Sequence, residues 1–148
     1  MPVTFVNIWE TKILDTIRTF LNDEFAGSIP VYTGNFKDMG SQSIRLNPIG
    51  SDLLRIDATR SETREYIVDV SYTFKEKIIK KDTWEHILRQ LSHIEALFHD
   101  NTTGSGNTFY DGRLETARIN EKTEEEAEIE GLNVVHWEWR GTYTGNTT

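Results

Sequence analysis

The sequence predicts an α+β fold, a mostly antiparallel β-sheet with two amphipathic helices packed on one of its faces. Residues 65–75 alternate strictly, with apolar side chains at Tyr66, Val68, Val70, Tyr72 and Phe74. Because successive side chains of a strand point to opposite faces, this pattern indicates a strand packed on one side. The period then changes to that of a helix, with an apolar stripe at Trp84, Ile87, Leu88, Leu91, Ile94 and Phe98. A strand followed by a helix that can cover its apolar face forms a compact core.

The chain is expected to begin with an amphipathic helix from about Asn7 to Ala26. One face of this helix carries the apolar residues Ile8, Trp9, Ile13, Leu14, Ile17, Phe20, Leu21 and Phe25. Gly27 is suited to end the helix, and Pro30 prevents its continuation. Residues 29–32 then predict a short extended piece, and residues 33–41 a loop.

The next segment predicts an antiparallel hairpin. Residues 43–46 form a short strand, residues 47–51 a turn or bulge, and residues 52–59 a second alternating strand. Residues 60–63 can then turn the chain into the strand at 65–75, although no Asn-Gly or Asp-Gly pair marks that turn.

The second half of the chain predicts one helix and two strands. Asp82 and Glu85 have the spacing of a capping box, and the helix that they begin should run to about His99. The remaining segments are a polar loop at 100–107, a strand at 108–119, a charged connection at 120–131 and a last strand at 132–144. The order helix, strands, helix, strands suits an antiparallel sheet with helices over one face.

Composition limits the class of protein. A chain of 148 residues fits one domain, spanning 1–148, with a real core. It has no cysteine, which excludes disulfides, a thiolate nucleophile and cysteine-bound metal. The net charge of −8 disfavours non-specific DNA binding, which needs a clustered basic surface. No apolar run approaches the roughly 18 residues that span a bilayer, and residues 1–10 lack signal-peptide features, so the cytoplasm is the default compartment.

The sequence shows no catalytic, cofactor-binding or metal-binding motif. His86 and His93 are seven residues apart, about 10 Å along a helix, which is too far to share one ion without further ligands. The carboxylates near the hairpin alternate with arginines, a pattern that cross-strand ion pairs explain more simply than a catalytic cleft. We therefore expect a protein that is not an enzyme and uses no cofactor or metal. The alternative is a small metal-dependent hydrolase that uses Asp52, Asp57, Glu62 and His86.

An acidic run lies between two aromatic-rich strands. It contains six glutamates and one lysine within ten residues: Glu121, Glu124, Glu125, Glu126, Glu128 and Glu130, with Lys122. Two interpretations remain open, a solvated loop that keeps the protein soluble, and a loop that projects negative charge toward a partner or into a pore. On the following strand, Trp137 and Trp139 are expected in the core. His136 is expected on the opposite face as a surface or interface group.

The order of the elements resembles that of the tail-terminator (tail-completion) proteins of long-tailed bacteriophages. The resemblance rests on an amino-terminal amphipathic helix of about 18 residues, a breaker-rich loop, and a hairpin that ends in the Tyr-x-Val-x-Val-x-Tyr-x-Phe strand from Tyr66 to Phe74. A helix with a Trp/Ile/Leu stripe and two closing strands follow. The match covers nearly the whole chain at the level of element order and length.

This resemblance implies a structural protein of the virion. Such proteins form a ring, commonly a hexamer, at the head-proximal end of the tail tube. The ring ends tube polymerisation and docks the tail to the neck or head, and DNA passes through its lumen. The implied partners are copies of the same chain, the tail tube protein and a neck or head-completion protein, with no membrane. The implied location is the virion tail or neck, assembled in the host cytoplasm.

The acidic run is then a candidate for the lumen or the docking edge of the ring. A ring closes through head-to-tail contacts between two different patches on each subunit. Candidate subunit-interface residues are Arg55, Asp57, Glu62, Arg64 and His136. The alternative within the same class is another head–tail joint protein, either a neck or head-closure protein or the tail tube subunit itself.

Overall fold

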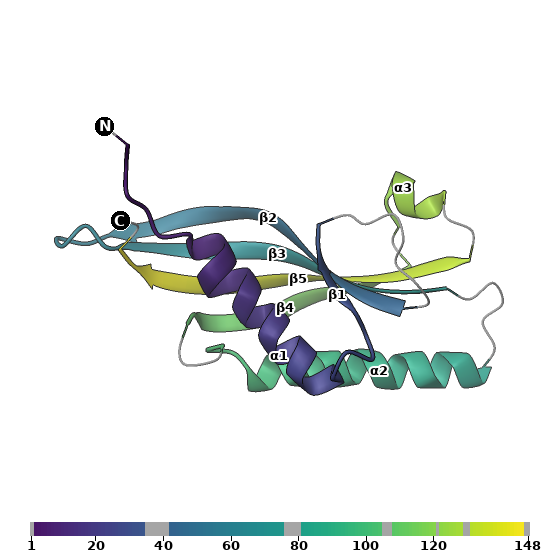
Figure 1. Ribbon diagram of the computed structural model, residues 1–148. Helices are drawn as coiled ribbons and strands as arrows, with labels where there is room; N and C mark the ends of the chain where they lie inside the picture. The colour runs from purple at the N-terminus through teal and green to yellow at the C-terminus, as the bar shows by residue number, and fades with distance from the viewer. Residues whose placement is uncertain are drawn as a thin grey trace.

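The structure is a computed structural model, which describes residues 2–34, 42–75, 81–104, 108–120, 122–128 and 131–146 (Figure 1). Its helical elements are the π-helical turn η1 (Trp9–Leu14), α1 (Asp15–Phe25), α2 (Lys81–Asp100) and the short α3 (Glu124–Ala127). Its strands are β1 (Val31–Thr33), β2 (Gln42–Ile56), β3 (Glu62–Lys75), β4 (Tyr110–Ile119) and β5 (Leu132–Gly145). In the described part of the chain, no helix has the length and apolar character that would let it cross a membrane.

The five strands form one sheet in the order β1-β2-β3-β5-β4. The long strands β2, β3, β5 and β4 pair antiparallel, and only the short β1 runs parallel to its neighbour. Figure 1 shows α1 and α2 against the same face of this sheet. The predicted α+β fold is therefore confirmed.

The hairpin differs from its prediction in one respect. Residues 47–51 do not separate two strands, because β2 runs continuously from Gln42 to Ile56. The breakers are accommodated as register shifts against β3 between Pro48 and Gly50 and between Leu53 and Arg55. A bulge absorbs an extra residue without ending the ladder. As a result, the β2–β3 hairpin is long, and its tip extends beyond the helices (Figure 1).

The core lies between the sheet and the two long helices. The alternation predicted for β3 is confirmed, since Tyr66, Val68, Val70, Tyr72 and Phe74 are all buried. Trp137 and Trp139 of β5 lie beside Val70 and Val68 and are also buried, as predicted. Edge-to-face ring pairs lie within this core: Trp9 contacts Tyr66 of the sheet, Phe20 of α1 contacts Phe98 of α2, and Phe109 contacts Trp139.

The first helix matches its predicted span but begins in π-helical geometry. It ends at Phe25, and Ala26 caps it with a left-handed φ of 49°, followed by Gly27 with a φ of 79°. The chain therefore turns at Ala26, one residue before the predicted stop, with Gly27 supporting the left-handed turn. At this end of α1, Glu24 lies 2.8 Å from His93 of α2, which links the two helices.

The opposite face of the sheet is also partly covered. Ser71 and Thr73 of β3 point away from the long helices, yet both are buried. Leu132 and Val134 of β5 form a second, small apolar cluster on this side. Figure 1 shows α3 over this end of the sheet. The expectation that β3 is packed on one side alone is therefore wrong at its carboxyl end, because the predicted connection at 120–131 folds back onto the strands.

Candidate functional site

The connection at 120–131 is anchored to the sheet through Glu126. The side chain of Glu126 is only 3% exposed and forms an ion pair with Arg45 of β2. Its second oxygen lies 3.0 Å from Nε2 of His136. The same oxygen accepts a hydrogen bond from the backbone N–H of Thr123 at 2.8 Å, and the Thr123 hydroxyl accepts one from the N–H of Glu126. This reciprocal capping box begins α3.

His136 connects this anchor to the neighbouring strand. Its Nδ1 lies 3.0 Å from an oxygen of Asp69, so the ring stands between two carboxylates. Burial opposes the charged form of His136, but the hydrogen bonds and charges of Asp69 and Glu126 outweigh it and raise the pKa of His136. Burial likewise opposes the charge of Glu126, yet Thr123, His136 and Arg45 together lower the pKa of Glu126. The geometry favours a negatively charged Glu126 beside a positively charged His136, and this ion pair holds α3 on the sheet.

This geometry corrects one expectation about the acidic run. Glu126 neither projects into solvent nor is available to a partner, because it compensates the buried cation of Arg45. Glu128 is exposed, as a docking residue would be. The side chains of Glu124 and Glu125, and the whole of Glu121 and Glu130, lie outside the described residues.

The candidate interface residues do not form one surface. Arg55 and Asp57 are exposed near the hairpin tip, and Arg64 pairs with Glu62 at 3.0 Å close by. His136 lies opposite Ser71, whereas Glu62 lies opposite Gly145. The two positions are therefore nine residues apart along β3, a span of roughly 30 Å for an extended strand. His136 belongs to the α3 anchor, and the other four residues belong to the hairpin end of the sheet.

Asp57 has a local structural role in the hairpin turn. One carboxylate oxygen accepts hydrogen bonds from the backbone N–H groups of Thr59 and Ser61, at 2.9 and 3.1 Å. It also accepts one from the Thr59 hydroxyl at 2.6 Å. The Thr59 hydroxyl is the first cause that lowers the pKa of Asp57. The carboxylate thus orders the turn between β2 and β3.

Sequence reasoning missed an ion-pair network on the face opposite the long helices. Arg140 of β5 contacts Glu65 at 2.6 Å, and Glu115 and Glu138 at 3.2 Å each. Arg113 of β4 contacts Glu115 at 2.9 Å. Hydrogen bonds to Glu65 and Glu138 raise the pKa of Arg140. Only the alternation within each strand was visible in the sequence, and the register that brings three strands together was not.

The described residues contain no group of three or more histidine, aspartate or glutamate side chains placed to hold a metal ion. Asp52, Asp57 and Glu62 belong to the β2–β3 hairpin, whereas His86 lies in the first part of α2. Figure 1 shows that α2 begins at the end of the molecule opposite the hairpin tip. The structure therefore does not bring together the four residues of the hydrolase alternative.

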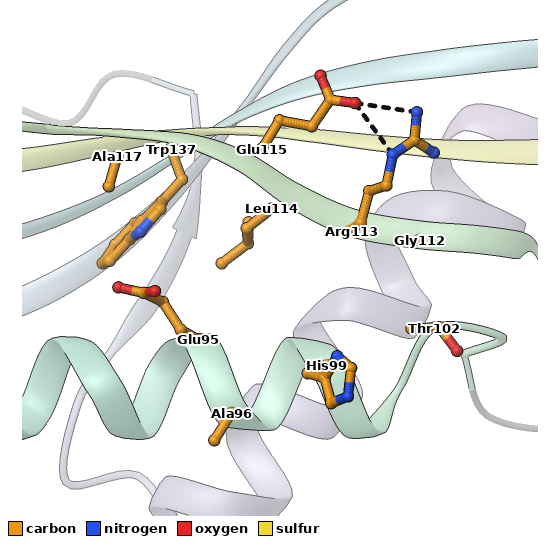
Figure 2. A pocket seen from close by; sticks show the side chains of 10 residues that line it. All are labelled: Glu95, Ala96, His99, Thr102, Gly112, Arg113, Leu114, Glu115, Ala117 and Trp137. Carbon is orange, nitrogen blue, oxygen red and sulfur yellow. Dashed lines mark hydrogen bonds and ion pairs between the residues drawn. The ribbon is translucent and has the colours of Figure 1, made fainter.

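The described residues line a hollow on each face of the sheet. A cavity of about 410 Å³ lies between α2 and β4, with Glu95, His99, Leu114, Ala117 and Trp137 among its lining residues (Figure 2). A smaller one of about 180 Å³ lies beside His136 on the opposite face, lined also by Asp69, Thr116, Arg118 and Glu138.

Comparison with solved structures shows that this fold has been seen before. The chain is similar to a chain in a structure described as the virion of a native gene transfer agent particle. The TM-score is 0.56 at 9% sequence identity, and the match covers 90% of this chain and 95% of the other. At this identity the likeness shows a shared fold. No protein-family model matches the sequence, and no curated protein matches it.

Proposed function

We propose that this protein is a structural component of a tailed, phage-like virion. In this role it forms a ring, expected to be a hexamer, at the head-proximal end of the tail tube. The ring ends tube polymerisation and docks the tail to the neck, and DNA passes through its lumen. The observation that carries the proposal is the fold shared, over nearly the full length of both chains, with a chain of a gene transfer agent virion. The protein acts by contact and needs no catalysis or cofactor.

Both edges of the sheet support assembly with other chains. In the described part of the chain, β1 pairs with only three residues of β2, Ile44 to Leu46, and β4 pairs only with β5. Among the described residues, the part of β2 beyond Leu46 and the outer side of β4 therefore offer backbone donors and acceptors to a neighbour. The two edges differ in sequence, as the head-to-tail contacts of a ring require.

The charge of the protein supports a lumen through which DNA slides. The net charge of −8 repels the phosphate backbone, so DNA that moves through the opening meets no strong non-specific binding site. Glu128 is one exposed carboxylate of the acidic run that could face the lumen or the docking edge.

The direct test uses polymerisation of the tail tube protein from the same virion, with and without this protein. We expect shorter tubes, each carrying one ring of this protein at a single end, when tubes are imaged by electron microscopy with a label on its carboxyl terminus. Copy number separates the alternatives. One ring per particle fits a terminator or neck protein, and incorporation along the whole tube fits the tube subunit. Tubes that form unchanged, with no bound protein, would contradict the proposal.

A further inference from the structure

Beside the cavity between α2 and β4 lies a buried polar atom that has no hydrogen-bond partner among the described residues. Trp137 is 2% exposed, yet its indole Nε1–H has no hydrogen-bond partner among the residues that the structure describes. Figure 2 shows the Trp137 ring extending from β5 toward Glu95 of α2, with Leu114 and Ala117 of β4 nearby. A buried donor without a partner costs free energy, so an acceptor that enters the cavity would be favoured.

Glu95 is the second unused group at this site. It is exposed on α2 at the wall of the cavity, and within the described parts of the chain its carboxylate makes no ion pair or hydrogen bond. The other carboxylate at the cavity, Glu115, already pairs with Arg113 and Arg140. The cavity therefore combines an apolar part, lined by Leu114, Ala117 and Trp137, with one donor and one carboxylate that have no partner among the described residues. This combination suits a segment that presents a backbone carbonyl beside a cationic side chain.

The tip of the β2–β3 hairpin has the complementary properties. Leu53, Leu54 and Ile56 are large apolar residues that the fold leaves exposed. Arg60 follows in the turn with an exposed side chain, and its guanidinium has no partner among the described residues. The hydrogen bonds from Thr59 and Ser61 to Asp57 hold this turn in one shape, which reduces the entropy that docking would cost.

We propose that the hairpin tip of one copy docks in the α2–β4 cavity of the next copy. A carbonyl of the tip accepts the hydrogen bond from Trp137, Arg60 pairs with Glu95, and the exposed leucines and isoleucine cover the apolar rim. The contact is head-to-tail, because the tip and the cavity are different surfaces of the same chain. This inference rests on the proposed ring and names the contact that closes it.

Charge reversal tests the pairing of Arg60 with Glu95. We expect Arg60→Glu and Glu95→Arg each to weaken self-association at least tenfold, as measured by sedimentation velocity of the full-length protein. The double variant should restore it. An equimolar mixture of the two single variants should also restore it, because every junction of an alternating ring with an even number of copies then joins opposite charges. Lys12→Glu and Asp23→Arg, both on the amino-terminal helix, are matched controls that change the net charge equally and should leave self-association unchanged.

A covalent trap tests the position of the tip. The chain has no cysteine, and Ala58 in the turn and Ala117 at the cavity are both exposed. Under mild oxidation, Ala58→Cys combined with Ala117→Cys should give a ladder of disulfide-linked oligomers that Arg60→Glu abolishes. The control pair of Ala58→Cys with Thr11→Cys should give far less. Trp137→Phe, once circular dichroism shows it to be folded, should weaken self-association several-fold by removing the donor.

The outcomes separate the docking contact from the ring function. Rings on tube ends that none of these variants alters would overturn the docking contact and leave the proposed function in place. Oligomers that respond to the charge variants but never bind tubes would support the contact and contradict the function. A wild-type protein that stays monomeric in solution and on tubes would overturn both.

Discussion

Glu126 and His136 face each other across the gap between α3 and β5, with 3.0 Å between the Oε1 and Nε2 atoms. Arg45 of β2 pairs with Glu126, and Asp69 of β3 pairs with His136. One glutamate of an otherwise acidic connection thus attaches that connection to three strands. The position of α3, and of the exposed Glu128 that follows it, depends on this cluster.

The His136 contact predicts a pH dependence of stability. The pKa of His136 is raised above its ordinary 6.5, so its charged form contributes stability that is fully present below pH 6.5 and is lost as the pH rises through the raised pKa. We expect the free energy of unfolding in urea to fall over this range. His136→Gln should remove that decline, and His86→Gln, at an exposed position, should retain it. An identical decline in both variants would contradict the assignment to His136.

Low pH should also destabilise this cluster, through protonation of Glu126. The pKa of Glu126 is lowered below its ordinary 4.5, so its carboxylate contributes stability that is present above pH 4.5 and is lost as the pH falls through the lowered pKa. At pH 6, Glu126→Ala should destabilise the protein by about 3–5 kcal/mol, because it removes the buried carboxylate that pairs with Arg45 and His136. The matched Glu128→Ala should change the free energy of unfolding by no more than about 0.5 kcal/mol. Denaturant titration measures both, and equal effects would contradict the anchor.

Gly141 should not tolerate a side chain. A Cβ at this position would lie 2.3 Å from the buried ring of Trp139, which itself packs on Phe109. Gly141→Ala should therefore destabilise the protein by about 1–3 kcal/mol through overpacking. Gly50→Ala serves as the control, because a Cβ there meets nothing within 4 Å. A neutral effect of Gly141→Ala in thermal unfolding would show that the ring shifts freely.

Divalent metals should not stabilise the protein. The four residues of the hydrolase alternative, Asp52, Asp57, Glu62 and His86, are spread between the hairpin and α2. A metal bound at one hundred times its dissociation constant would add about 2.7 kcal/mol to the free energy of unfolding. We expect Mg²⁺, Mn²⁺ and Zn²⁺ each to leave the thermal midpoint unchanged in a dye-based shift assay. A dose-dependent rise that Asp57→Asn and His86→Gln abolish would contradict the non-enzymatic function.

Strong local patterns made most elements predictable. The alternation from Tyr66 to Phe74 and the helical stripe from Trp84 to Phe98 each repeat over many residues, so periodicity identified them. The continuous β2 was missed because the breakers around Pro48 favour a turn locally. In the structure, pairing with β3 on both sides of the bulge outweighs that local preference.

The sequence by itself determined the α+β class, the helix faces and the buried face of β3, because side-chain periodicity encodes which side of an element leaves water. Tertiary structure alone decided that Glu126 is buried against Arg45 and His136, and that Arg140 joins glutamates from β3, β4 and β5. Charged residues carry no periodic signal that reports their partners. Their roles depend on strand order and register, which arise only when segments distant in sequence pair in the folded chain.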